Sequence, residues 1–133
     1  MNTALSVFVA GLLAIAAESS SPQSLAIYFV PFQFETYEPV TASNITAKAK
    51  YTININDQNE IPKLLALTSG KSPARFNGKR VRLLVIVNVE QGEERIMVDA
   101  EGDVFDGKSE RALGKQKFDQ LKALMAELTK GKD

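Results

Sequence analysis

The sequence predicts an α+β domain with a mainly antiparallel sheet of four to five strands and two helices. Three stretches carry this prediction. Residues 79–106 hold three apolar runs separated by turn-forming residues, which favours a meander of three strands. Residues 45–55 alternate apolar and polar side chains, as a half-buried strand does, and residues 115–129 repeat apolar side chains at helical spacing. The expected order is β-β-α-β-β-β-α.

Composition narrows the function classes. The chain has 133 residues, 44% of them hydrophobic, which is enough for one domain with a core of its own. Its 16 basic and 16 acidic residues cancel, so no global field attracts nucleic acid or anionic lipid. Without cysteine or histidine, the chain lacks thiolate nucleophiles, zinc-thiolate sites and the commonest general base. We therefore expect neither a cofactor nor a metal.

The N-terminal segment predicts export. Residues 1–17 carry no charged side chain, are apolar from Ala4 onward and end in the small-x-small pattern Ala14-Ile15-Ala16, which is typical of a signal peptide. The absence of Lys or Arg before the apolar run departs from that pattern. The alternatives are a membrane anchor, which needs about 20 apolar residues, and a buried helix. We expect a mature domain of residues 18–133 in the periplasm or outside the cell, without a stable membrane anchor.

The first half of that domain should contain two strands and a helix. Leu25–Phe34 is rich in β-branched and aromatic residues, and Pro31 within it predicts an edge strand or a bend. After a loop, residues 45–55 form the second strand. The helix should begin at Asp57 or Asn59, with Asp57 and Glu60 forming a capping box, and end at residues 69–70.

The second half contains the central strand. Residues 71–78 read as a loop, and Asn77-Gly78 favours a tight turn into the strand Val81–Val89. Leu84 and Ile86 interrupt the polar side of that strand, so we expect both of its faces to be covered. Residues 107–114 should connect the meander to the last helix, residues 115–129.

Carboxylates gather between the last two strands of the meander. This acidic turn, residues 99–106, contains Asp99, Glu101, Asp103 and Asp106. Together with Glu110 it matches part of a twelve-residue calcium loop, but Val104 stands where that loop needs glycine, and no helix precedes it. We favour a polar β-turn with solvated carboxylates. Two carboxylates would also suit a glycosidase-like hydrolase, although nothing in the sequence predicts a raised pKa for either one.

Basic residues gather just before the central strand. This basic loop, residues 71–80, contains Lys71, Arg75, Phe76, Lys79 and Arg80, and the run without an acidic residue continues to Arg82. Basic clusters with aromatic residues occur in nucleic-acid binders. The zero net charge, the export signal and the single aromatic residue argue against that reading. Opposite charges on neighbouring segments favour recognition of a charged protein partner.

The sequence thus predicts a small exported binding protein, for example an inhibitor or immunity-type protein that plugs an enzyme's site. The alternatives are a carboxylate-dependent hydrolase and an envelope-associated domain that pairs through an exposed strand edge at residues 25–34. A deep pocket around Asp99, Asp103 or Asp106 would favour the hydrolase, a convex charged loop the inhibitor, and an unpaired first strand the envelope domain.

Overall fold

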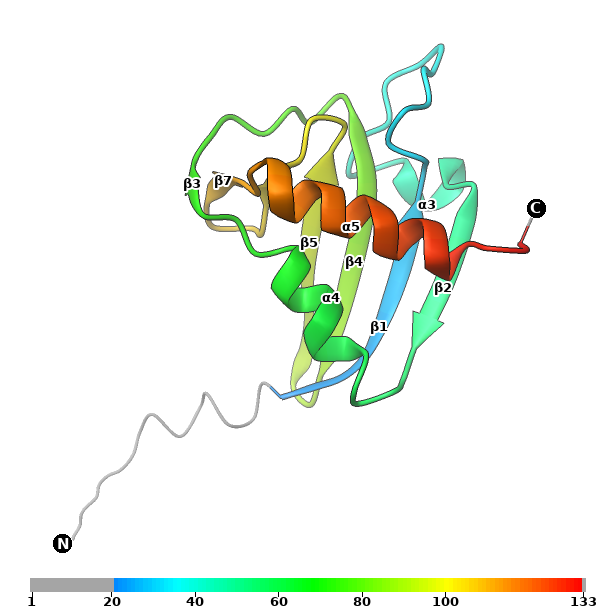
Figure 1. The fold of residues 1–133 in the computed structure, drawn as a ribbon, viewed down its shortest axis with the longest axis vertical. Helices are drawn as coiled ribbons and strands as arrows, with labels where there is room; N and C mark the ends of the chain where they lie inside the picture. Colours follow the sequence, from blue (N-terminus) through cyan, green and yellow to red (C-terminus); the bar gives the residue numbers. More distant parts are fainter. Residues whose placement is uncertain (1–20, 133) are drawn as a thin grey trace, which may run out of the picture.

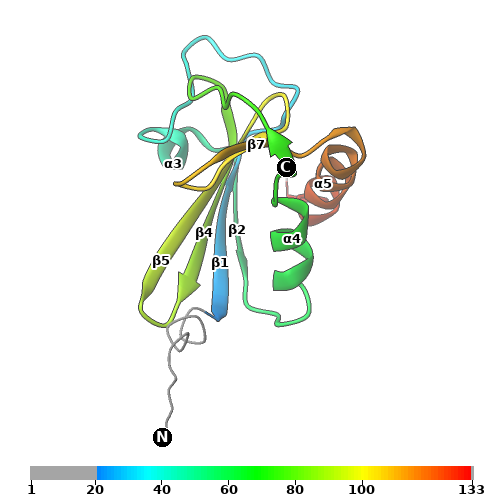
Figure 2. The ribbon, with the colours of Figure 1, turned by 90° about the vertical axis from the view of Figure 1, so that its left-hand side faces the viewer.

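The computed structural model describes residues 21–132, in which one antiparallel sheet has helices on both faces (Figures 1 and 2). Along the chain the elements are β1 (Pro22–Phe29), α3 (Ile45–Lys48), β2 (Tyr51–Ile55), α4 (Ile61–Leu67), β3 (Ser72–Pro73), β4 (Val81–Val89), β5 (Gly92–Asp99), β6 (Asp103–Phe105), β7 (Glu110–Ala112) and α5 (Lys115–Leu128). The sheet order is β2-β1-β4-β5-β6-β7-β3. The α+β class and the antiparallel sheet are confirmed, whereas the predicted four to five strands and two helices are fewer than the seven strands and three helices of the described residues. The predicted signal peptide, residues 1–17, lies outside the described residues.

The main core lies between the sheet and the two helices α4 and α5. From β4, the side chains of Leu83, Val85 and Val87 point into it and are fully or almost fully buried. Leu64 of α4 and Leu121 of α5 meet them from the helix side and are equally buried. The apolar stripe predicted for the last helix is therefore the face of α5 that packs against the sheet.

A second, smaller core lies on the opposite face, under α3. Leu84 of β4 is buried there with Val30, Val40, Ile45 and Val81. Val81 joins this side because the register of β4 against β5 shifts between Val81 and Leu83, as in a β-bulge. The prediction that both faces of the central strand are covered is confirmed (Figure 2).

The prediction of an edge position for the first strand is wrong. β1 lies between β2 and β4, and it pairs with β4 from Pro22 to Phe29 and with β2 from Leu25 to Phe29. The Val30 N–H still donates to the Arg82 carbonyl at 2.7 Å, but Pro31 has no N–H to continue the ladder, so pairing stops before it. Proline therefore ends an interior strand here. The envelope-domain alternative loses its premise, an exposed edge at residues 25–34.

The predicted strand 45–55 divides into a helical turn and a strand. The Asn44 side chain accepts the Thr41 N–H at 2.7 Å and donates to the Pro39 carbonyl at 3.0 Å, which closes a turn that leads directly into α3. Ile45 is thereby buried on the α3 side. Only Tyr51–Ile55 is a strand, and its apolar residues Ile53 and Ile55 are buried as the alternation predicts.

The helix α4 begins and ends close to its predicted limits, but without the capping box. The Asp57 carboxylate accepts the Asn59 N–H at 2.8 Å, and no side chain caps the helix at Glu60. Pro62 lies in the first turn, where a missing N–H is harmless. Within residues 21–132, no helix is long and apolar enough to cross a membrane.

Two short strands occupy segments that the sequence predicts as loop and connector. Ser72 and Pro73 of β3 pair with Ala112 and Arg111 of β7, and β7 pairs in turn with β6. Neither strand is longer than three residues. Such strands carry no periodicity of their own, so only their neighbours in the sheet define them.

Candidate functional site

The basic loop and the acidic turn lie against each other at one end of the sheet. They share an open hollow of about 550 Å³, lined by Arg75, Phe76, Asn77, Gly78, Lys79, Asp99, Glu101 and Asp103. Most residues singled out in the sequence therefore meet at one place. Three do not line the hollow. Lys71 leads into β3, Arg80 faces a neighbouring cavity and Asp106 lies at a different cleft.

Asp99 joins the two segments from inside. Its side chain is fully buried, and its carboxylate accepts the backbone N–H groups of Asn77 at 2.8 Å and of Glu101 and Asp103 at 2.9 Å each. The expectation that all carboxylates of the acidic turn are solvated is wrong for this residue. A buried carboxylate bound by backbone N–H groups stabilises a loop conformation. Asp99 is a positioning residue.

Further contacts hold the basic loop in place. The Phe76 ring lies 5.8 Å from the Phe105 ring, centroid to centroid, and the Phe76 N–H donates to the Glu110 carboxylate at 2.7 Å. Arg80 hydrogen-bonds the Glu101 carboxylate, and its backbone carbonyl accepts the Ala100 N–H at 2.9 Å. The charge of Arg80 is thus partly used within the molecule.

Arg75 and Lys79 remain available to a partner. Both side chains are exposed, and within the described part of the chain neither takes part in an ion pair. Because the backbone beneath them is held by Asp99 and Phe76, their positions are defined before any partner arrives.

Two of the three carboxylates of the hollow already have partners within the molecule. Burial, followed by the negative charges of Asp99 and Glu101, raises the pKa of Asp103. Asp99 is committed to backbone N–H groups, and Glu101 to Arg80. Among residues 21–132, no three acidic side chains converge as a metal site. The calcium-loop alternative also loses its first ligand, since both Asp99 oxygens already accept N–H groups.

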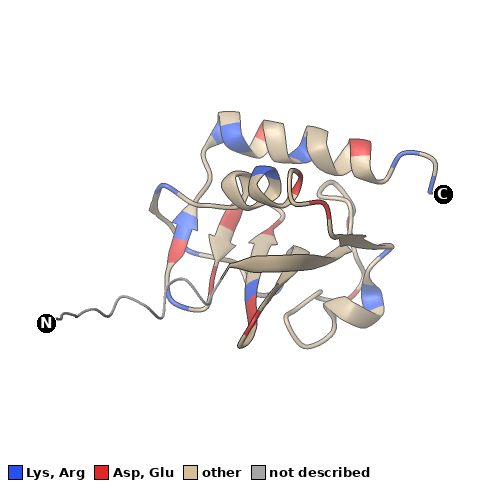
Figure 3. Ribbon diagram, turned by 90° about the horizontal axis from the view of Figure 1, so that it is seen from below, with Lys and Arg blue, Asp and Glu red and all other residues tan. Residues whose placement is uncertain are grey.

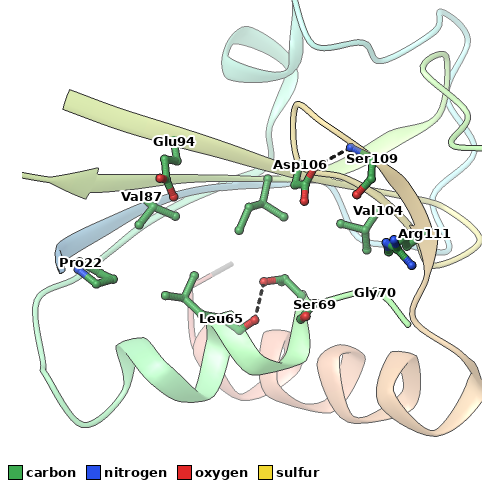
Figure 4. A pocket seen from close by; sticks show the side chains of 12 residues that line it. Pro22, Leu65, Ser69, Gly70, Val87, Glu94, Val104, Asp106, Ser109 and Arg111 are labelled. Atoms are coloured by element: carbon green, nitrogen blue, oxygen red, sulfur yellow. Dashed lines mark hydrogen bonds between the residues drawn. The ribbon is translucent and has the colours of Figure 1, made fainter. Parts of the chain in front are cut away.

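A second cavity, which sequence reasoning missed, opens between α4 and the strands β4 to β7 (Figure 4). This cleft has a volume of about 380 Å³. Its apolar lining comes from Leu65, Val87, Ile96 and Val104, and its polar lining from Thr68, Ser69, Glu94, Asp106, Ser109 and Arg111. These residues come from separate elements, so no local sequence pattern predicts the cleft.

Asp106 has a fixed ionisation state at this cleft. Its carboxylate accepts the backbone N–H groups of Ser109 and Lys108, each at 2.8 Å, and these two bonds lower the pKa of Asp106. The group therefore stays negative and cannot serve as a general acid near neutral pH. Ser109 also lines the cleft, and the chain has no histidine to activate its hydroxyl.

Comparisons with known proteins give no relationship, since the chain matches no protein-family model, no curated protein and no solved structure. The geometry of the two segments and of the cleft is therefore the only basis for a function of this chain.

Proposed function

We propose that this chain is a small exported binding protein that recognises a charged protein partner, as an inhibitor or immunity-type protein does. The contact surface is the bipolar surface, defined here as Arg75, Phe76, Lys79, Glu101 and Asp103. The observation that carries the proposal is the buried Asp99 carboxylate, which ties the basic loop to the acidic turn by three backbone hydrogen bonds.

Preorganisation is the physical basis of this role. A flexible loop loses conformational entropy when it binds, at a cost of about 0.5–1.5 kcal/mol for each side chain that becomes ordered. Here the backbone is already ordered, which leaves only the exposed ends of Arg75 and Lys79 to be fixed. A partner with acidic groups opposite these two residues would gain complementarity at a low cost of ordering.

Only local clusters of charge can attract a partner, because the net charge of the chain is zero. Lys, Arg, Asp and Glu are interspersed over the ribbon, in keeping with a net charge of zero (Figure 3). Charges of opposite sign on one surface fix the register of a complex and speed its formation. The basic loop lines a hollow, so the convex shape expected of an inhibitor loop is not found here. The hollow is open, which supports contact with a protein surface better than enclosure of a small substrate.

The partner can be sought directly. A C-terminally tagged full chain is expressed in its native host, and bound proteins are recovered from the envelope fraction. Reversing two charges with Arg75→Glu and Lys79→Glu should reduce recovery of the partner at least tenfold, because like charges in a contact cost several kcal/mol. The matched control is Lys130→Glu with Lys132→Glu, which changes two exposed lysines near the C-terminus. Equal recovery by both double variants would contradict the proposal.

The cleft favours one competing function, a carboxylate-dependent hydrolase. Its volume of about 380 Å³ suits a small substrate, and Asp106 and Glu94 line it. The lowered pKa of Asp106 argues against the hydrolase, because it leaves the cleft without an identified general acid. Chromogenic esters and glycosides offer a test. Turnover by the wild type that disappears in Asp106→Asn, while partner recovery is unchanged, would favour the hydrolase.

A further inference from the structure

Arg82 is a buried cation without a counterion. Only 1% of its surface is exposed. Its Nη1 donates to the Val81 carbonyl at 3.1 Å and its Nη2 to the Phe34 carbonyl at 3.0 Å, whereas its Nε has no hydrogen-bond partner. No carboxylate of the described residues lies within 4.0 Å of the guanidinium. Since buried charges in proteins are usually paired, this arrangement needs an explanation.

The surroundings of Arg82 do not neutralise it. Burial lowers the pKa of Arg82 most, and the positive charge of Arg80 lowers it further, against the attraction of Glu35, Glu101 and Asp99. Glu101 is already bonded to Arg80, whose guanidinium also lies 3.9 Å from the Glu35 carboxylate. The nearby negative charges are thus shared with another cation.

A cavity of about 240 Å³ has Arg82 in its wall. Its walls are formed by Glu35, Thr36, Tyr37, Glu38, Pro39, Lys79, Arg80 and Arg82. Three of these residues are basic and two are acidic, so the lining carries a net charge of +1. One of the two acids, Glu38, is bonded to Lys48 at 2.6 Å outside the lining. The cavity therefore holds an excess of positive charge beside a guanidinium that lacks an ion-pair partner.

We propose that this cavity binds an oxyanion, a carboxylate or a phosphate group, which pairs with Arg82 and Arg80. A guanidinium presents its N–H groups in a planar fork that matches the two oxygens of such a group. The exposed loop of residues 33–39, which includes the fully exposed Tyr37, supplies five of the residues that line this open cavity. The site goes beyond recognition of a protein partner, because a free anion would occupy it without one.

Thermal unfolding of the full chain tests this site. Sodium phosphate and sodium acetate are each titrated against sodium chloride at matched ionic strength. An anion that binds only the folded state should raise the Tm with the logarithm of its concentration above the Kd, by about 5 °C once its concentration is ten times the Kd. A rise with phosphate alone assigns a phosphate group as the ligand, and a rise with acetate assigns a carboxylate. A Tm that responds no more to either anion than to chloride overturns the proposal.

Variants connect the response to Arg82. The variant Arg82→Met replaces the unpaired buried charge with an unbranched apolar chain, although it leaves the Val81 and Phe34 carbonyls without this donor. It should lose the response to the anion. The control Arg95→Met removes an exposed arginine that pairs with Glu93 at 2.9 Å, and it should keep the response. A response that persists in Arg82→Met overturns the proposal.

A second variant decides the question if Arg82→Met does not fold. Lys79→Gln changes an exposed cation in the wall of the same cavity. Its Kd for the anion, measured by calorimetric titration, should rise severalfold because one positive charge near the ligand is removed. An unchanged Kd would count against this cavity as the binding site.

Discussion

Asp99 shows how much a single side chain contributes to the candidate surface. It is chemically identical to Asp103 and lies four positions before it, yet Asp99 is fully buried while Asp103 is only half-buried. The difference arises because the backbone N–H groups of the basic loop and of the acidic turn all point at Asp99. Its charge therefore organises the surface from beneath and is not presented to a partner.

Replacing this carboxylate should loosen both segments. Asp99→Ala leaves the N–H groups of Asn77, Glu101 and Asp103 without their acceptor, so we expect a loss of about 3 kcal/mol in the free energy of unfolding. Denaturant titration measures the loss. Hydrogen exchange should accelerate at these three amides. As a control, Asp106→Ala removes an exposed acceptor of two N–H groups and should cost about 1 kcal/mol. Equal losses in the two variants would show that burial of Asp99 is unimportant.

Among the elements, the contact between the acidic turn and α5 depends on a glycine. Gly102 has a φ of +88°, and a Cβ placed there would lie 2.8 Å from the Phe118 ring. That ring cannot easily withdraw, because it also packs edge-on against Phe32 with the centroids 5.0 Å apart. The turn and the helix are thus in close contact only because residue 102 has no side chain.

The substitution Gly102→Ala separates backbone strain from crowding. We expect a loss of about 2–3 kcal/mol, about 1 kcal/mol from the positive φ and the rest from overlap with Phe118. The matched control is Gly107→Ala. Gly107 has a φ of +93°, but nothing lies within 4 Å of a Cβ at that position. Chemical denaturation measures both variants. A loss in Gly102→Ala no larger than in Gly107→Ala would mean that Phe118 moves aside freely.

At the scale of the whole molecule, β4 joins two cores. Leu84 is buried on the α3 side and Leu121 of α5 lies in the core on the other side, while β4 supplies residues to both. Neighbouring strands β1 and β5 pair with β4 along most of its length. We infer that neither core can unfold while the other stays intact.

This coupling predicts a single unfolding transition. Leu84→Ala and Leu121→Ala should each lower the free energy of unfolding by about 2–5 kcal/mol, as large-to-small changes at buried positions do. Far-UV circular dichroism and tyrosine fluorescence should report coincident transitions for the wild type and for both variants. Two separate transitions in Leu84→Ala would show that the α3 side unfolds on its own.

The sequence predicted an element correctly where neighbouring residues carry a periodic pattern or a turn-forming pair. The β-branched run Val81–Val89, the helical repeat of residues 115–128 and the turn at Asn77-Gly78 each carry their own periodicity or turn chemistry, and each occurs at its expected place. The prediction was wrong where contacts between residues far apart in the chain determine the structure. Pro31 predicted an edge position or a bend within a strand reaching Phe34, but the strand ends at Phe29, and no local feature shows that partners flank it on both sides.

By itself the sequence determined the α+β class, the central strand with two covered faces, and the two oppositely charged segments, because these follow from periodicity and composition. The tertiary structure alone decided that the two segments share one hollow, that Asp99 is enclosed, that Arg82 is buried without a counterion, and that a cleft opens beside α4. Burial and partner choice depend on residues that the chain brings together from far apart. The spacing of neighbouring residues in the sequence does not indicate which distant residues will come into contact.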